Sequence, residues 1–299
     1  MDGTKARPGL GRVVVGVDGS PSARKAVMWA AAEAALRGST LCLVHATDTD
    51  APGPFLSREE ITGTRRAGRE LLDRTAQEIT ARHPGLTVVE ELTEGPAPDR
   101  LRRAAALSGT IVVGHRGLGG FSSLLLGSVG LEVAAAATTP VVVVRGDTEA
   151  AEGRVVLTAV RDEADVGCAR AAAREAALRG VPLRLLHIWG LGLSVGSRAM
   201  VRGGEEAARE HVRPLSSILD RVREEFPDLT VQADGQKSHS VAGALVEATH
   251  DAGLVVAGGR RSPGYLGPTL GRITLGLLQH AHCPVELVPR QGPGHGTTS

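Results

Sequence analysis

An internal repeat is the sequence feature that most constrains this chain. Short segments and single glycines of the first half recur in the second half, in the same order. The matches include RVVV at 12–15 with RVVL at 154–157, EAALRG at 33–38 and again at 175–180, Pro84 with Pro227, and Gly114, Gly127 and Pro140 with Gly258, Gly271 and Pro284. The offset drifts from 142 to 144 residues, as insertions in loops produce. The sequence therefore predicts two copies of one domain.

Each copy alternates short runs of β-branched residues with helical patterns. In the first copy the predicted strands cover residues 12–17, 41–46, 86–92, 111–113 and 141–144. The predicted helices follow Ser20-Pro21, cover Arg58–Arg82 and Pro98–Leu107, and begin near Ser128. Continuous apolar runs of this length are typical of strands covered on both faces. The prediction is an α/β fold of two tandem, doubly wound domains, each a parallel sheet flanked by helices.

Composition excludes several classes of function. The chain of 299 residues has 34 basic and 33 acidic residues, so we expect neither a nucleic-acid-binding nor a membrane-attracting surface. Its three cysteines (Cys42, Cys168, Cys283) have no paired spacing, which argues against a disulfide framework or a zinc site. Residues 1–12 lack the apolar core of a signal peptide, and no apolar run is long enough to span a bilayer. We expect a cytoplasmic protein.

A glycine-rich loop follows the predicted strand at 111–113. It contains Gly114, Gly117, Gly119 and Gly120, and Gly127-Ser128 then precedes an Ala-rich helical pattern. Without side chains in the way, backbone N–H groups can converge on an anion. The beginning of the following helix would add its partial positive charge. The segment therefore predicts a site for the phosphates of a nucleotide.

The motifs GVDGSPSA near residue 20, G-x2-G-x9-G-S (Gly114, Gly117, Gly127, Ser128) and TPVVVVR resemble the universal stress protein family, in its tandem-domain actinobacterial type. The resemblance implies five-stranded parallel sheets of order 3-2-1-4-5, an adenine-nucleotide alpha-hydrolase-like fold. It also implies ATP as a ligand of the first domain. The expected domains are 1–147 with an intact ATP motif and 153–292 with a degenerate one, followed by a disordered tail at 293–299. In that strand order ligands bind where the chain direction reverses, between strands one and four.

The ATP-binding residues expected in the first domain fall at the ends of strands one, two and four. Asp18 would accept from a ribose or adenine group, although a turn-capping role is the alternative. Gly16 allows close backbone approach or simple packing, and Ala46 is assigned to the adenine pocket by resemblance alone. Ser128 would both cap the helix and donate to phosphate. The expected phosphate-binding residues are Gly114, His115, Arg116, Gly117, Gly119, Gly120, Gly127, Ser128 and Val129.

For two of these residues, and for a repeated histidine, the alternatives stay open. Arg116 either adds positive charge to the loop or is a solvated surface residue. His115 could contact phosphate, but no carboxylate is placed in sequence to orient it as a base. His45 recurs as His187 without a partner suited to metal binding, which indicates a structural position.

The second copy departs from the ATP motif. Asp18 is matched to Val160, Gly117 to Arg261 and Ser128 to Arg272. An arginine in place of a glycine occupies space that phosphates need, so we expect the second domain to bind ATP poorly. The alternative is that Arg260, Arg261 and Arg272 bind some other anion.

No P-loop motif and no evident general base are present, so we expect no efficient ATPase, no catalytic residue and no metal site on the protein. ATP, with Mg²⁺ bridging its phosphates, would be a regulatory or structural ligand in a stress response. A slow ATP-hydrolysing or phosphotransfer enzyme is one alternative, and a nucleotide-independent scaffold is the other. The expected contact between the domains pairs their last strands, Val141–Val144 and Val285–Val288, and homodimer formation is left open.

Overall fold

The computed structural model describes residues 11–47, 57–105, 109–117, 126–136, 138–148, 153–190, 204–258 and 270–289. The chain divides into two compact units, Met1–Arg145 and Gly146–Ser299. Within the described residues, no helix combines the length and the apolar character that crossing a membrane requires.

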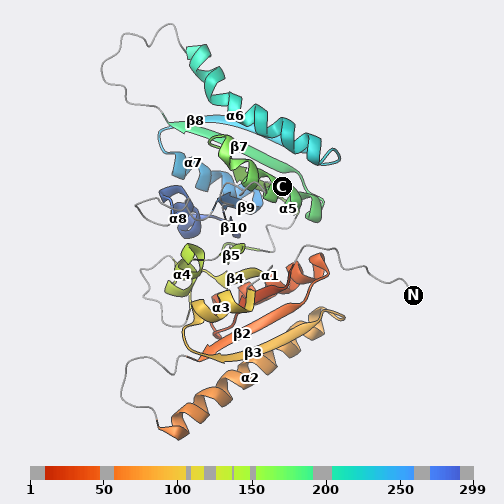
Figure 1. Cartoon of the computed structure of the whole chain (residues 1–299), viewed down its shortest axis with the longest axis vertical. Helices are drawn as coiled ribbons and strands as arrows, with labels where there is room; N and C mark the ends of the chain where they lie inside the picture. The colour runs from red at the N-terminus through yellow and green to blue at the C-terminus, as the bar shows by residue number, and fades with distance from the viewer. Residues whose placement is uncertain are drawn as a thin grey trace, which may run out of the picture. The chain divides into compact units, whose positions relative to one another are not determined.

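The first unit is a five-stranded parallel sheet with helices on both faces (Figure 1). Its strands run in the order β3-β2-β1-β4-β5, as predicted. The elements in chain order are β1 (Val13–Gly16), α1 (Pro21–Arg37), β2 (Leu41–Thr47), α2 (Arg58–Arg82), β3 (Val88–Glu94), α3 (Ala97–Ala105), β4 (Thr110–Gly114), α4 (Ser128–Ala136) and β5 (Val141–Val144).

The strands alternate their side chains between two apolar layers. Val13, Val15 and Val17 share one layer with the buried alanines of α1 and with Leu72 and Ile79 of α2. The opposite face is covered by α3 and α4, which contact each other. Because both faces are covered, β1, β4 and β5 are almost fully buried, which explains why they are continuous valine and isoleucine runs.

The ends of α1 and α2 are fixed by their sequences. Ser20 precedes Pro21, and its hydroxyl accepts from the Ala23 N–H, so α1 has a side-chain cap and a proline in its first turn. Gly38 ends α1 in the left-handed conformation. Ser57 and Glu60 form a capping box at α2, whose bounds are those that the sequence predicts.

The third strand begins later than predicted. The sequence pattern placed it at 86–92, whereas β3 covers Val88–Glu94. Leu86 is apolar because it packs against the core from a turn, in which its N–H donates to the His83 carbonyl.

The second unit repeats the architecture, with its strands in the order β10-β9-β6-β7-β8. Its elements are β6 (Val155–Ala159), the 3₁₀ turn η1 (Glu163–Asp165), α5 (Val166–Arg179), β7 (Leu183–Gly190), α6 (Gly204–Glu225), β8 (Val231–Ser238), α7 (Val241–Ala248), the 3₁₀ turn η3 (Thr249–Asp251), β9 (Ala252–Gly258), α8 (Arg272–His280) and β10 (Val285–Val288).

Hydrogen bonds between strands correct one match between the two copies. The Val17 N–H donates to the Val44 carbonyl, and the Val160 N–H donates to the Leu186 carbonyl. The same two valines are also contacted by the repeated histidine. His45 Nδ1 lies 2.6 Å from the Val17 carbonyl oxygen, and His187 Nδ1 lies 2.7 Å from the Val160 carbonyl oxygen. Val160 therefore corresponds to Val17. The counterpart of Asp18 is Arg161, not Val160, so the charge at this position is reversed.

Candidate functional site

Asp18 lies two residues beyond β1, at the carboxyl end of the sheet. Its Oδ1 accepts from the Ser20 N–H at 2.8 Å, so the carboxylate does help to shape the turn, as the alternative interpretation held. The other oxygen, Oδ2, faces Gly117: a Cβ added to that glycine would lie 2.7 Å from it. The structure thus brings Asp18 and the glycine-rich loop together, although about a hundred residues separate them in sequence.

Two serines of the first turn of α1 hold this loop in place. The Ser20 hydroxyl donates to the Arg116 carbonyl at 3.4 Å, in addition to capping the helix. The Ser22 hydroxyl accepts from the Arg116 N–H and lies 3.1 Å from His115 Nδ1. Ser22 was not singled out from the sequence, although it belongs to the motif GVDGSPSA. It connects α1 with the residues that follow β4.

Gly114 is required by packing. A Cβ there would lie 2.6 Å from Ser22 Oγ and 2.7 Å from both its backbone carbonyl carbon and oxygen. The end of β4 therefore fits against α1 only without a side chain. Its role in the site is indirect, because it sets how closely the loop approaches α1 and Asp18.

The electrostatic environment of His115 is positive. Burial lowers the pKa of its imidazole, and the charge of Arg145 lowers it further. A hydrogen bond to the Val144 backbone raises it, while the charges of Arg116 and Lys25 again lower it. Three cationic side chains thus act on one half-buried ring, and together with burial they disfavour its protonated form. Sequence analysis named Arg116 but neither Lys25 nor Arg145.

The beginning of α4 completes the group. Ser128 is the first residue of the helix, and the Leu131 N–H donates to the Gly127 carbonyl, so Ser128 does not cap it as predicted. The Gly127 N–H donates to the His115 carbonyl at 2.8 Å and is not available to a ligand. The amides of Ser128 and Val129 belong to the first turn and have no acceptor within the helix. Gly127 lies close to Gly117, since an added Cβ would be 3.7 Å from its nitrogen.

The remaining predicted residues lie at the edges of the group or outside the described chain. Gly16 is the last residue of β1, and a Cβ added there would lie 3.4 Å from Leu101 Cδ1 of α3. Ala46 lies near the end of β2, paired with Thr93. Gly119 and Gly120 lie outside the described residues.

Within the described chain, neither the repeated histidine nor a metal centre is part of this site. A Cβ at Gly68 of α2 would lie 2.7 Å from the His45 ring, which supports a structural role for this histidine and its repeat. Among the residues with described positions, no three His, Cys, Asp or Glu side chains gather as a metal site.

The universal stress protein family model matches residues 9–145 and again 154–289. A universal stress protein of Mycolicibacterium smegmatis is 31% identical over 292 residues, which cover 92% of this chain and 96% of that one. The crystal structure of a universal stress protein from Archaeoglobus fulgidus shares the fold, with a TM-score of 0.71 and 16% identity over 94% of this chain and 98% of that one. A universal stress protein solved in complex with cAMP is 29% identical over 45% of this chain and 97% of that one, with a TM-score of 0.35. The chain belongs to the universal stress protein family, with one copy of the family domain in each half.

Proposed function

We propose that the first unit binds ATP at the carboxyl ends of β1 and β4, as a regulatory or structural ligand in a stress response. The observation that carries the proposal is the meeting of Asp18, Gly117 and the beginning of α4. A carboxylate that can accept from ribose hydroxyls lies beside Gly117, which has no side chain, and a helix N-terminus suited to phosphate. The site is at the reversal of strand order between β1 and β4, where open α/β sheets bind ligands.

The charges around His115 support a polyphosphate ligand. Arg116, Lys25 and Arg145 all place positive charge near His115, the residue that follows Gly114 in the loop. The described residues offer no cluster of acidic side chains for a cation. Mg²⁺ would therefore be held mainly by the phosphates, as is usual for this ion in nucleotide sites.

The geometry gives no support to rapid hydrolysis. His115 Nδ1 lies 3.1 Å from Ser22 Oγ, and the carboxylate of Asp18 is assigned to ribose, so no group in the proposed arrangement is assigned to activate water. We therefore favour a nucleotide that stays bound over one that is hydrolysed. The slow enzyme would be supported if the purified protein converted bound ATP to ADP within hours, measured by chromatography of the released nucleotide.

The direct test is calorimetry with ATP and the variant Asp18→Asn. Asparagine keeps an oxygen for the Ser20 N–H but loses the charge, so the turn stays intact while the hydrogen bond to ligand weakens. A hydrogen bond to a charged group contributes about 1.5–3 kcal/mol, so affinity should fall about tenfold or more. Asp99→Asn, an exposed aspartate of α3, is the matched control.

Equal affinity of Asp18→Asn and the original chain for ATP would remove Asp18 from the site. Titration with cAMP in place of ATP tests whether the triphosphate matters. Mass spectrometry of nucleotide released from protein purified without added ligand identifies what the chain holds. If no nucleotide binds in any of these measurements, the results would contradict ATP binding and favour the nucleotide-independent scaffold.

A further inference from the structure

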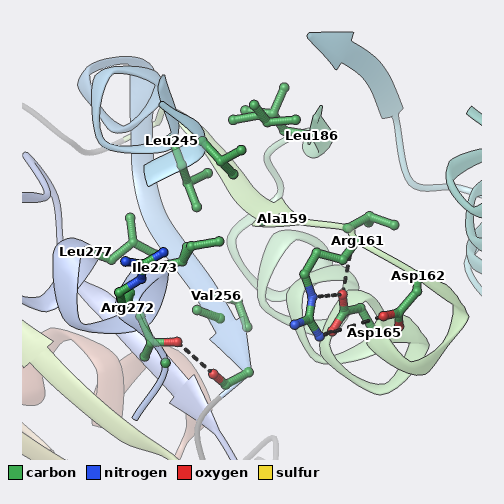
Figure 2. A pocket seen from close by; sticks show the side chains of 17 residues that line it. Ala159, Arg161, Asp162, Asp165, Leu186, Leu245, Val256, Arg272, Ile273 and Leu277 are labelled. Carbon is green, nitrogen blue, oxygen red and sulfur yellow. Dashed lines mark hydrogen bonds and ion pairs between the residues drawn. The ribbon is translucent and has the colours of Figure 1, made fainter. Parts of the chain in front are cut away.

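The second unit contains a cavity of about 600 Å³ at the carboxyl ends of β6, β7 and β9 (Figure 2). Helices α7 and α8 contribute the rest of its wall. Its volume is in the range of small-molecule sites. Its lining includes the counterparts of Gly16, Asp18, Ala46, Gly114, Gly127 and Ser128 of the first unit, so the duplicated position is open and has a different lining.

The inner wall of the cavity carries larger apolar side chains than the matching positions of the first unit. Ile188 stands at the position of Ala46, and Ala159 at the position of Gly16. Leu186, Leu245, Val256 and Leu277 form the buried base of this wall (Figure 2). Val241 and Ile273 are half-buried and present the apolar surface that a ligand can reach. The Thr274 hydroxyl also lines it, but donates to the Gly258 carbonyl at 3.3 Å. An aliphatic or aromatic body would therefore be favoured here over a polar ring.

At two polar positions of the lining, the second unit has a hydrogen-bond donor where the first unit has a residue that can accept. Arg161 replaces Asp18 and Arg272 replaces Ser128. A guanidinium has five N–H donors and no acceptor, so neither residue can accept from a ribose hydroxyl. Both suit a carboxylate or a phosphate oxygen.

The two arginines differ in whether a carboxylate of the second unit already pairs with them. The Arg161 N–H donates to Asp165 Oδ2 at 2.9 Å, and its guanidinium donates to both oxygens of that carboxylate, at 3.3 and 3.4 Å. Asp162 lies 3.9 Å from the same guanidinium. Arg272 is exposed at the beginning of α8, and no carboxylate with a described position pairs with it. Figure 2 shows Arg161 directed toward Asp165 and Asp162, and Arg272 beside Ile273 and Leu277.

This arrangement also limits the charge of the ligand. The carboxylates of Asp162 and Asp165 balance Arg161 and would repel a triphosphate. Among the lining residues with described positions, Arg272 alone is left to compensate added negative charge. A single anionic group on an apolar body is the ligand that fits both parts of the cavity.

We propose that the second unit binds a small amphipathic monocarboxylate, with its carboxylate on Arg272 and its apolar body against Ile188, Val241 and Ile273. The inference concerns a site other than the ATP site and is independent of it. The first unit would respond to nucleotide and the second to an apolar acid.

The test is isothermal titration calorimetry of the full chain with hexanoate, octanoate and decanoate below their micelle-forming concentrations. Affinity should rise with chain length, by about fourfold for each CH₂ that enters the apolar wall. Arg272→Gln should weaken octanoate binding about tenfold or more. Arg223→Gln, an exposed arginine of α6 outside the cavity, should leave it unchanged. 1-Octanol, which lacks the charge, should bind more weakly than octanoate.

The proposal is overturned if octanoate does not bind, or if Arg272→Gln and Arg223→Gln bind it equally. It is also overturned if Arg272→Gln lowers the number of ATP molecules bound per chain, because the second unit would then be a nucleotide site. Asp18→Asn should keep octanoate affinity, which separates this result from the outcome for ATP. Thermal unfolding of each variant shows whether the unit is still folded.

Discussion

Two glycines three residues apart are required for different physical reasons. Gly114 meets backbone atoms of Ser22, which cannot move without moving α1, whereas Gly117 meets only the end of the Asp18 side chain. The same substitution at the two positions should therefore change two different quantities. Stability should respond at Gly114, and ligand binding should respond at Gly117.

Gly114→Ala should lower the free energy of unfolding by about 1–3 kcal/mol, the usual cost of overpacking, because a methyl group 2.6 Å from Ser22 Oγ has no room. Gly117→Ala should change stability by less than about 0.5 kcal/mol, as at other surface positions, yet weaken ATP binding by displacing the Asp18 carboxylate. Urea unfolding and calorimetry separate the two effects. If Gly117→Ala unfolds as easily as Gly114→Ala, the distinction between packing and binding is wrong.

His115 gives the site a defined dependence on pH. Its pKa in the folded chain is lowered from 6.5, so the folded state binds this proton less readily than the unfolded state does. Its contribution to stability is present above the unfolded pKa and is lost as pH falls through that value toward the lower folded pKa. Bound phosphates would add negative charge and raise the pKa again.

NMR titration of the His115 ring, assigned by its loss in His115→Gln, should give a pKa below 6.5 without ATP and a higher one with it. Calorimetry in buffers of different ionisation enthalpy should then show proton uptake on binding near pH 6. An unchanged His115 titration in saturating ATP would place the phosphates elsewhere.

At the scale of elements, a buried ion pair within α1 is joined to β4 by a hydrogen bond. Arg37 Nε donates to Glu33 Oε1 at 2.6 Å, and its Nη1 donates to Thr110 Oγ1 at 2.9 Å. Both side chains of the pair are 3% exposed. The second unit repeats the pair as Arg179 and Glu175, but Arg179 is 18% exposed, and the counterpart of Thr110 is Leu254.

Arg37→Met should therefore cost about 3–5 kcal/mol of stability, because it leaves the Glu33 carboxylate buried without its cation. Arg179→Met is the matched substitution and should cost less than half as much, since water reaches that pair. Calorimetric unfolding of the two variants gives the comparison. Equal losses would mean that burial of the pair does not decide its contribution.

The elements could be predicted from sequence more fully than the site. Buried strands and capped helices carry their own patterns, which is why the fold class and the bounds of α2 agree with prediction. The strand order also agrees, but that prediction came from the family resemblance. The match of Asp18 to Val160 was wrong because a run of valines looks the same when it is shifted by one residue. Only the hydrogen bonds of Val17 and Val160 fix the register. Ser22, Lys25 and Arg145 were missed because their roles depend on segments that meet only in the folded chain.

At the scale of the whole molecule, duplication has preserved the sheet and changed the chemistry at its carboxyl ends. The scaffold tolerates this because each unit buries its own core, while the site is formed by residues beyond the strands. Reversal of charge at Arg161 is the sharpest single difference. It removes the acceptor that Asp18 offers and brings in the carboxylate of Asp165 as its partner.

The full chain should therefore bind one ATP, not two. Arg161 cannot accept from ribose, Ile188 takes the space that Ala46 leaves, and Asp162 and Asp165 repel phosphates. Asp18→Arg gives the first unit the residue of the second, and should reduce the stoichiometry measured by calorimetry from about one to about zero. Arg223→Gln, far in sequence from both positions, should keep it at about one. Two molecules of ATP per original chain would show that the second unit binds nucleotide despite the reversed charge. One molecule remaining in Asp18→Arg would show that an arginine at this position does not abolish binding.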